Sequence, residues 1–93
     1  MLRIGILGGT GNMGRGLAIR LALKHDVRIG SRSSDRASDI AKEQENIARG
    51  FYQAEMKGSI KGEYNIDAAR ESEIIVVALP SAAVIQTTTE LRA

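Results

Sequence analysis

The chain has 93 residues, of which 43% are hydrophobic, 26% are charged and only 3% are aromatic. This length suits a single domain, and the scarcity of aromatic side chains excludes a stacking platform for single-stranded nucleic acid. The chain has no cysteine and one histidine, which excludes disulfides, thiolate nucleophiles and cysteine or histidine metal clusters. We therefore expect a cytoplasmic protein without a metal site. No segment has the apolar length of a membrane span, so we expect no membrane partner.

The small net charge of +2 is unevenly distributed along the chain. Residues 1–40 contain seven basic and three acidic side chains, whereas residues 41–93 contain six basic and eight acidic ones. The first half therefore favours an anionic partner, either a nucleic-acid backbone or a small phosphorylated ligand. The few aromatic residues and the nearly neutral balance make nucleic acid the less favoured of the two, and we expect no nucleic-acid partner.

Apolar patterning and turn residues predict strands and helices that alternate along the chain. The expected strands are residues 2–7, 26–30, 59–61 and 74–79. The expected helices are residues 12–24, 33–52, 65–70 and 81–91, with Ser33 or Ser34, Asn65 and Ser81 as N-caps. Residues 53–64 are polar and glycine-rich, which favours a loop with a short edge strand. The unbroken apolar run at 74–79 is typical of a strand covered by helices on both faces.

The second predicted helix has one mostly apolar face, which includes Phe51 near its end. Overall, the alternation predicts an α/β fold, a Rossmann-like doubly wound parallel sheet with strand order 3-2-1-4. A complete dinucleotide-binding fold contains two such halves, and 93 residues accommodate only the first half with one strand of the second. The sequence also stops within a helical pattern. We therefore expect residues 1–93 to form one nucleotide-binding domain of a longer, truncated enzyme.

A G-x-G-x-x-G motif, formed by Gly9, Gly11 and Gly14, lies between the first predicted strand and helix. In such a motif the first glycine permits a tight turn, the second lets a pyrophosphate approach the backbone, and the third lets the helix pack closely. The helix then presents the N–H groups of Asn12 and Met13 to the anion. The motif lacks the following Lys-Ser or Lys-Thr of a P-loop.

The segment after the second strand predicts which dinucleotide binds. NAD-specific sites usually have a carboxylate there, whereas this chain has Ser31 and Arg32, with Arg36 one helical turn further on. Arg32 can form a forked contact with a 2′-phosphate or stack on adenine, and Ser31 can donate its hydroxyl. Asp35 is more consistent with a dipole partner in the first turn of its helix. The segment therefore favours NADP as the cofactor.

The turn after the fourth predicted strand forms the remaining candidate contact. It consists of Ala78, Leu79, Pro80 and Ser81. This turn is expected at the carboxyl edge of the sheet, where the nicotinamide ribose should lie, although it is also explained as a plain strand terminator. The sequence contains no acid–base pair, nucleophile–base pair or metal cluster above background, so we predict no catalytic residue.

Several of these segments together resemble the archaeal NADPH-dependent coenzyme F420 reductases. They are residues 7–14, residues 16–22, Gly30-Ser31-Arg32, Asp67-Ala68-Ala69 and Ala78-Leu79-Pro80. In that family an amino-terminal Rossmann domain binds NADP, and a smaller carboxyl-terminal region completes the deazaflavin pocket and the homodimer. The resemblance implies pyrophosphate contacts from Thr10, Gly11, Asn12 and Met13, 2′-phosphate contacts from Ser31, Arg32 and Arg36, and nicotinamide contacts from Leu79, Pro80 and Ser81.

The resemblance also implies an NADP-dependent oxidoreductase that transfers hydride between C4 of the nicotinamide and C5 of coenzyme F420. Such a transfer requires orientation and exclusion of water more than an acid or a base. The deazaflavin-binding portion has no counterpart in these residues, so we expect this chain alone to be incomplete for catalysis. Two alternatives remain open. One is an atypical short-chain NADP-dependent reductase, because Gly8, Gly11 and Gly14 also fit G-x-x-G-x-x-G, and the other is a non-catalytic NADP-binding or redox-sensing module.

Overall fold

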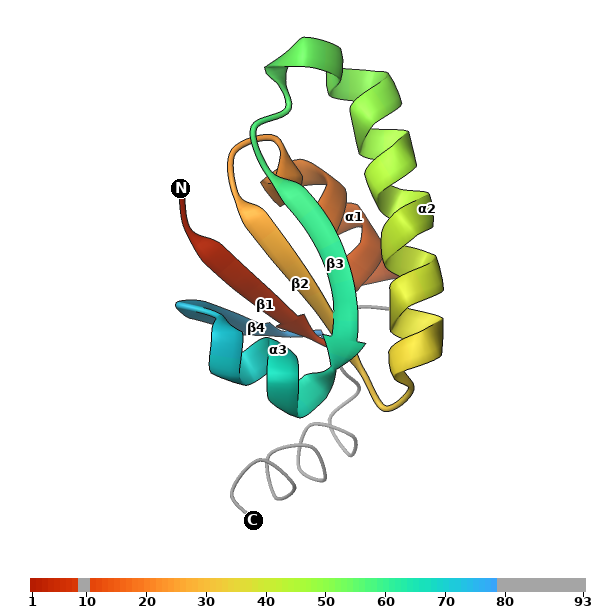
Figure 1. Ribbon diagram of the computed structural model, residues 1–93, viewed down its shortest axis with the longest axis vertical. Helices are drawn as coiled ribbons and strands as arrows, with labels where there is room; N and C mark the ends of the chain where they lie inside the picture. The colour runs from red at the N-terminus through yellow and green to blue at the C-terminus, as the bar shows by residue number, and fades with distance from the viewer. Residues whose placement is uncertain (9–10, 79–93) are drawn as a thin grey trace.

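The computed structural model describes residues 1–8 and 11–78 of the chain. Strands and helices alternate along this part, as Figure 1 shows, which confirms the predicted α/β class. The strands are β1 (Arg3–Leu7), β2 (Asp26–Ser31), β3 (Ser59–Tyr64) and β4 (Ile74–Val77). The helices are α1 (Asn12–Ala22), α2 (Ser34–Tyr52), the 3-10 turn η1 (Gln53–Glu55) and α3 (Asn65–Glu71). No helix in the described ranges combines the length and the hydropathy needed to cross a bilayer.

The four strands form one parallel sheet in the order β3-β2-β1-β4, which confirms the predicted order. Leu7 at the end of β1 pairs with Gly30 of β2 and with Val77 of β4. Ser31, the last residue of β2, pairs with Tyr64, the last residue of β3. The carboxyl ends of all four strands therefore meet at one edge of the sheet.

The face of the sheet that α1 and α2 cover is apolar. Its strands contribute Ile6, Val27 and Ile29, which are fully buried. The same core cluster also contains Ala18, Ala22, Ala41, Ala48, Met56 and Ile60. The helix residues in this cluster are alanines, and their small side chains allow both helices to lie close to the sheet.

The opposite face of the sheet is covered by α3, which packs over glycines. A Cβ atom on Gly5 would lie 2.5 Å from Oγ of Ser72, and one on Gly30 would lie 2.6 Å from Oδ1 of Asn65. Side chains alternate between the two faces along a strand, so these glycines leave room on this face without changing the apolar one. The close approach of α3 thus depends on two residues without side chains.

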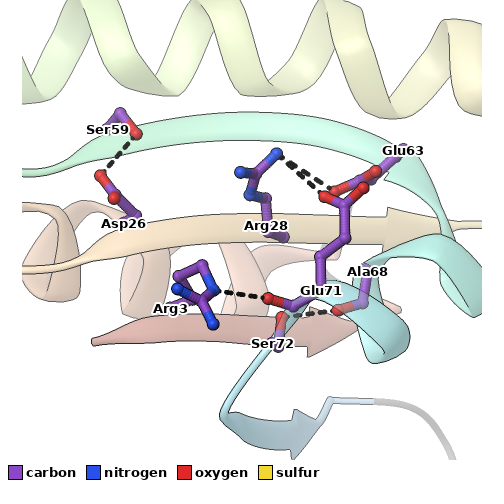
Figure 2. Close-up of polar contacts among 8 residues, drawn as sticks. All are labelled: Arg3, Asp26, Arg28, Ser59, Glu63, Ala68, Glu71 and Ser72. Atoms are coloured by element: carbon purple, nitrogen blue, oxygen red, sulfur yellow. Dashed lines mark hydrogen bonds and ion pairs between the residues drawn. The ribbon is translucent and has the colours of Figure 1, made fainter.

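Ion pairs and hydrogen bonds also hold α3 against the sheet (Figure 2). Nη1 of Arg28, on β2, lies 3.5 Å from Oε1 of Glu63 and 3.2 Å from Oε2 of Glu71. Nε of Arg3, on β1, donates to the backbone carbonyl of Glu71 at 2.9 Å. Strands β1 and β2 therefore both contact the end of α3 through arginine side chains.

Strand β3 is longer than the sequence predicts, because it runs over Ser59–Tyr64 and follows η1, a turn that was not expected. The polar composition of β3 does not indicate a strand of this length. Each of its six residues nevertheless pairs with one residue of β2. Two contacts from other elements satisfy its polar groups. Oγ of Ser59 donates to Oδ1 of Asp26 at 2.9 Å, and Oε1 of Glu45 accepts from the N–H of Ile60 at 3.2 Å.

Two further expectations are wrong for the described residues. Strand β4 is not covered on both faces, because Ile74, Ile75 and Val77 are each about half exposed at one edge of the sheet. Phe51 is 79% exposed, whereas the neighbouring Tyr52 packs against the core. β4 ends at Val77, so Ala78 is not part of the strand expected at 74–79. Residue 79 of that strand and the helix expected at residues 81–91 lie outside the described ranges.

Candidate functional site

The candidate site lies at the carboxyl edge of the parallel sheet, which is where open α/β sheets bind ligands. The backbone N–H of Ala78 donates to the carbonyl of Leu7 at 2.9 Å, so Ala78 lies beside the end of β1 as expected. The segment that starts at Ser31 lies at the end of the neighbouring strand. The structure therefore brings the described part of the glycine motif, the Ser31–Arg36 segment and Ala78 to one edge. The predicted site residues Gly9, Thr10, Leu79, Pro80 and Ser81 lie outside the described ranges.

A turn at Gly8 precedes the glycine motif, whose described part begins at Gly11. The φ of 71° at Gly8 is the only positive glycine φ in residues 1–8 and 11–78, and a side chain would strain this conformation. The N–H of Gly8 donates to Oδ1 of Asn65 at 3.2 Å. Its carbonyl accepts from the N–H of Gly11 at 3.5 Å. Gly8 therefore connects the end of β1 both to α3 and to the start of α1.

Gly11 is a glycine that the chain's own packing does not require. It is the N-cap of α1 with a φ of −78°, a conformation open to any residue. Among the described residues, apart from its chain neighbours, the atom nearest to a Cβ on Gly11 would be the carbonyl oxygen of Gly8, 4.0 Å away. By contrast, a Cβ on Gly58 would lie 1.7 Å from the carbonyl oxygen of His25. The open space at Gly11 suits the close approach of a phosphate group to the backbone.

The N-terminus of α1 is suited to an anion. No side chain from the described residues caps it, and its first turn contains no acidic residue. The first N–H groups of a helix have no partner within the helix, and they lie at the positive end of its dipole. Met13 is 74% exposed and Gly14 is buried. The structure thus brings Gly11, Asn12 and Met13 to an accessible helix start, and their contact with phosphate stays a prediction.

The segment after β2 is ordered by its own serines. Oγ of Ser31 accepts from the N–H of Ser33 at 3.3 Å, and Oγ of Ser33 accepts from the N–H of Arg36 at 3.3 Å. Ser33 is therefore the N-cap of α2, which confirms one of the two predicted caps, and Asp35 lies in the first turn as expected. A hydroxyl that accepts one hydrogen bond still has its proton to donate, so Ser31 can still donate to a 2′-phosphate, as the sequence predicts. Arg32 and Arg36 are both exposed at this edge.

Glu63 lies at the same end of β3 and has a perturbed pKa. Burial raises the pKa of Glu63 above its ordinary value, and the hydrogen bond and negative charge of Glu71 raise it further, while the charge of Arg28 opposes the shift. These partners hold α3 on the sheet, so the shift is explained by packing rather than by catalysis. Across residues 1–8 and 11–78, no group of three or more acidic or histidine side chains is arranged to hold a metal ion.

Asn65 is the residue of this edge that sequence reasoning missed. The sequence predicts it as a helix cap, whereas the N-cap of α3 is Tyr64 and the side chain of Asn65 reaches Gly8 instead. Asn65 is only 7% exposed. A polar residue directly after a strand of a parallel sheet is a recognisable signal for this edge. The prediction does not use that signal, because the predicted strand ends at residue 61, three positions before the observed end of β3 at Tyr64.

Comparison with known proteins agrees with this geometry. Residues 3–93 match the protein family described as NADP oxidoreductase, coenzyme F420-dependent. The chain belongs to this family. It is similar to the F420-dependent NADP reductase of Methanocaldococcus jannaschii, with 37% identity over 91 residues that make up 98% of this chain and 40% of that relative.

Two further relatives carry the same name. The F420-dependent NADP reductase of Methanothermobacter marburgensis is 40% identical over 80 residues, which are 85% of this chain and 34% of the relative. That of Methanothermobacter thermautotrophicus is 34% identical over 93 residues, which are 99% of this chain and 38% of the relative. The chain thus spans between 34% and 40% of the length of these curated relatives.

Proposed function

We propose that this chain is the NADP(H)-binding domain of an oxidoreductase that transfers hydride between NADPH and coenzyme F420. The observation that carries the proposal is the accessible start of α1, where the space beside Gly11 is open and no acidic residue occupies the first turn. The proposed cofactor contacts are Gly9, Thr10, Gly11, Asn12, Met13, Gly14, Ser31, Arg32, Arg36, Ala78, Leu79, Pro80 and Ser81. The names of the three relatives support the choice of cofactor and co-substrate.

The pyrophosphate would be held mainly by backbone groups. The start of α1 offers N–H donors and the positive end of the helix dipole. A site of this kind needs a close approach of the backbone to the phosphates, and Gly11 leaves that approach open. The open Cβ position of Gly11 therefore supports a dinucleotide phosphate at the start of α1.

The 2′-phosphate would be held by side chains of the neighbouring segment. Ser31 has a hydroxyl proton to donate, and Arg32 and Arg36 supply positive charge at the same edge. The ends of adjacent strands are about 5 Å apart, so these groups lie next to the glycine motif. Since no carboxylate occupies residues 31–33, the segment has no group typical of NAD selectivity.

The nicotinamide end is proposed to lie on the other side of the glycine motif, beside Ala78 at the end of β4. When bound, NADP(H) would exchange a hydride with coenzyme F420. The chain's residues orient the dinucleotide, and no proton-transfer residue is needed for a direct hydride transfer. We assign no catalytic residue among the described ones.

The proposal extends to the complete enzyme, of which the relatives' lengths make this chain about two fifths. We propose that the deazaflavin pocket and a homodimer contact lie outside residues 1–93, and that the enzyme is cytoplasmic with small-molecule partners and no nucleic acid. Membership of the F420-dependent family favours this function over a short-chain reductase. A non-catalytic NADP-binding module is the alternative that the hydride assay below separates.

Cofactor selectivity tests the binding part of the proposal. Calorimetric titration of the 93-residue chain should show tighter binding of NADP than of NAD. Arg32→Ala should weaken NADP binding by roughly tenfold and leave NAD binding unchanged, because the lost contact is charge-assisted. Arg20→Ala, an exposed arginine in the last turn of α1, is the matched control. Equal losses for both cofactors would mean that Arg32 does not contact the 2′-phosphate.

Hydride transfer tests the remainder of the proposal. We expect the complete enzyme to reduce oxidised coenzyme F420 with NADPH, followed by deazaflavin absorbance, and the 93-residue chain to bind NADPH without turnover. Absence of reduction by the complete enzyme would favour the non-catalytic alternative. Turnover by the 93-residue chain on the order of 10 per second would show that no further segment is needed.

A further inference from the structure

We propose that Asn65 is a positioning residue for the glycine motif, whose side-chain amide holds the N–H of Gly8 and thereby fixes the start of α1 for pyrophosphate binding. This inference rests on the proposed function, because it concerns the same cofactor site. Asn65 belongs to α3, lies 57 residues from Gly8 in sequence, and is only 7% exposed.

The hydrogen bond between these two residues lies where the sheet ends. Leu7 is the last residue of β1 that pairs with β2 and β4, so Gly8 lies one residue beyond the ladder. Its N–H donates instead to Oδ1 of Asn65 at 3.2 Å. A backbone donor whose partner is removed in a partly buried position loses favourable energy without replacement. Asn65 therefore favours one conformation of the turn at Gly8.

A series of backbone hydrogen bonds connects this turn to α1. The carbonyl of Gly8 accepts from the N–H of Gly11 at 3.5 Å, and the carbonyl of Gly11 accepts from the N–H of Arg15 at 3.0 Å. The second of these is the first hydrogen bond of the helix. A change in the turn at Gly8 is therefore passed to Gly11 and to the N–H groups proposed to bind phosphate. A preorganised turn binds more tightly, because less conformational entropy is lost on binding.

Asn65 also packs against the end of β2, and this second contact can be separated from the first. A Cβ atom on Gly30 would lie 2.6 Å from Oδ1 and 3.0 Å from Cα of Asn65, so the side chain fills the space that this glycine leaves. Leucine has the same branched shape as asparagine, with two methyl groups in place of the amide oxygen and nitrogen, so it still fills this space but has no acceptor atom. Asn65→Leu should therefore keep the packing beside Ser31 and lose only the hydrogen bond to Gly8.

The experiment compares two ligands on the wild-type chain and on Asn65→Leu. NADPH contains both the pyrophosphate and the 2′-phosphate, whereas 2′-AMP contains only the 2′-phosphate. We expect the dissociation constant of NADPH to rise roughly tenfold and that of 2′-AMP to change by less than about twofold. Ser59→Ala is the matched control, because it removes a part-buried side-chain hydrogen bond at the opposite end of β3. It should leave both affinities unchanged.

Hydrogen exchange adds a measurement that needs no variant. The amide of Gly8 should exchange slowly in the free wild-type chain, and rapid exchange would overturn the inference. Unchanged NADPH affinity in Asn65→Leu, or equal loss of both ligands, would also overturn it while leaving the proposed function intact. Failure of the wild-type chain to bind NADPH at all would instead overturn the proposed function, and this inference with it.

Discussion

The helices α1 and α2 begin at the same edge of the sheet and cover the same face, yet their first turns differ. The first turn of α2 is stabilised by its own chain, because Ser33 accepts from the N–H of Arg36 and Asp35 faces the helix dipole. The first turn of α1 has no acidic residue and begins at Gly11, which has no side chain to cap it. One helix start at this edge is therefore stabilised by its own side chains, whereas the first turn of its neighbour has no acidic residue and no cap from Gly11, as expected for the proposed pyrophosphate contact.

Gly62 and Gly11 differ in how closely other parts of the chain pack against them. A Cβ atom on Gly62 would lie 2.0 Å from the carbonyl oxygen of Ala37, so this glycine lets the first turns of α2 approach β3. Apart from its two chain neighbours, the described residue nearest to a Cβ atom on Gly11 would be Gly8, whose carbonyl oxygen is 4.0 Å away. Gly62 is therefore required by the packing of α2 on β3, whereas the described residues give no packing reason for Gly11, which is consistent with the proposed phosphate contact.

Gly62→Ala should cause the largest effect of the substitutions considered. The added methyl group would push against the backbone of α2 at Ala37, which cannot move as a flexible side chain can. We expect a loss of about 3 kcal/mol in the free energy of unfolding, measured by urea denaturation. Gly50→Ala is the control on α2, because a Cβ there has no neighbour within 4 Å, and it should not destabilise. Similar stability of both variants would contradict this account of Gly62.

Gly11→Val should have the opposite profile, with a large effect on binding and a small one on folding. We expect NADPH affinity to fall by about a hundredfold, because the side chain would occupy the proposed phosphate approach. The melting temperature should fall by only a few degrees, since valine is a poorer N-cap than glycine. Gly16→Val, on the same helix with an equally open Cβ position, should bind NADPH normally. Normal binding by Gly11→Val would remove the basis for treating the start of α1 as a phosphate site.

These contrasts show which parts of the fold the sequence could predict. The strand order follows from alternation and from apolar runs such as residues 2–7 and 74–79, which are local patterns. Strand β3 was underestimated because its pairing depends on partners far along the chain. Asp26 binds Ser59, and Glu45 satisfies the N–H of Ile60, and neither contact is visible in a polar, glycine-rich segment.

The candidate site also has parts that the sequence predicts and a contact that it does not. The glycine motif and the Ser31–Arg36 segment are short, local sequence patterns, and the structure places their described residues at one edge. The bond from Asn65 to Gly8 links residues that only the folded sheet brings together.

Ser33→Ala tests whether the N-cap of α2 stabilises the fold without contacting the cofactor. Loss of the cap should lower the free energy of unfolding by about 1 kcal/mol. NADPH affinity should fall by less than about threefold, because Ser33 stabilises the helix rather than the ligand. Ser34→Ala is the matched control, since Ser34 was the other predicted cap and lies within the helix. A larger effect on binding than on stability would show that the start of α2 is also part of the site.

The smallest expected effect concerns α3, the helix that carries Asn65. The pKa of Glu63 is raised above its ordinary value of 4.5, mainly by burial and then by Glu71. The folded chain therefore holds this proton more tightly than the unfolded chain does. As a result, the stability that Glu63 contributes is present at low pH and is lost as the pH rises from about 4.5 through the raised pKa.

Glu63→Gln keeps the shape of the side chain and removes this titration. Below pH 4.5 Glu63 is protonated even in the unfolded chain, so we expect the variant and the wild type to melt at similar temperatures. At pH 7 we expect the melting temperature of the variant to be higher by less than about 4 °C. Loss of the ion pair with Arg28 opposes this gain, but Arg28 retains Glu71 at 3.2 Å. Glu43→Gln, an exposed residue of α2, controls for the loss of one negative charge. A variant that is less stable than the wild type at pH 7 would mean that the ion pair with Arg28 outweighs burial and Glu71, and that α3 is held at this edge by charge.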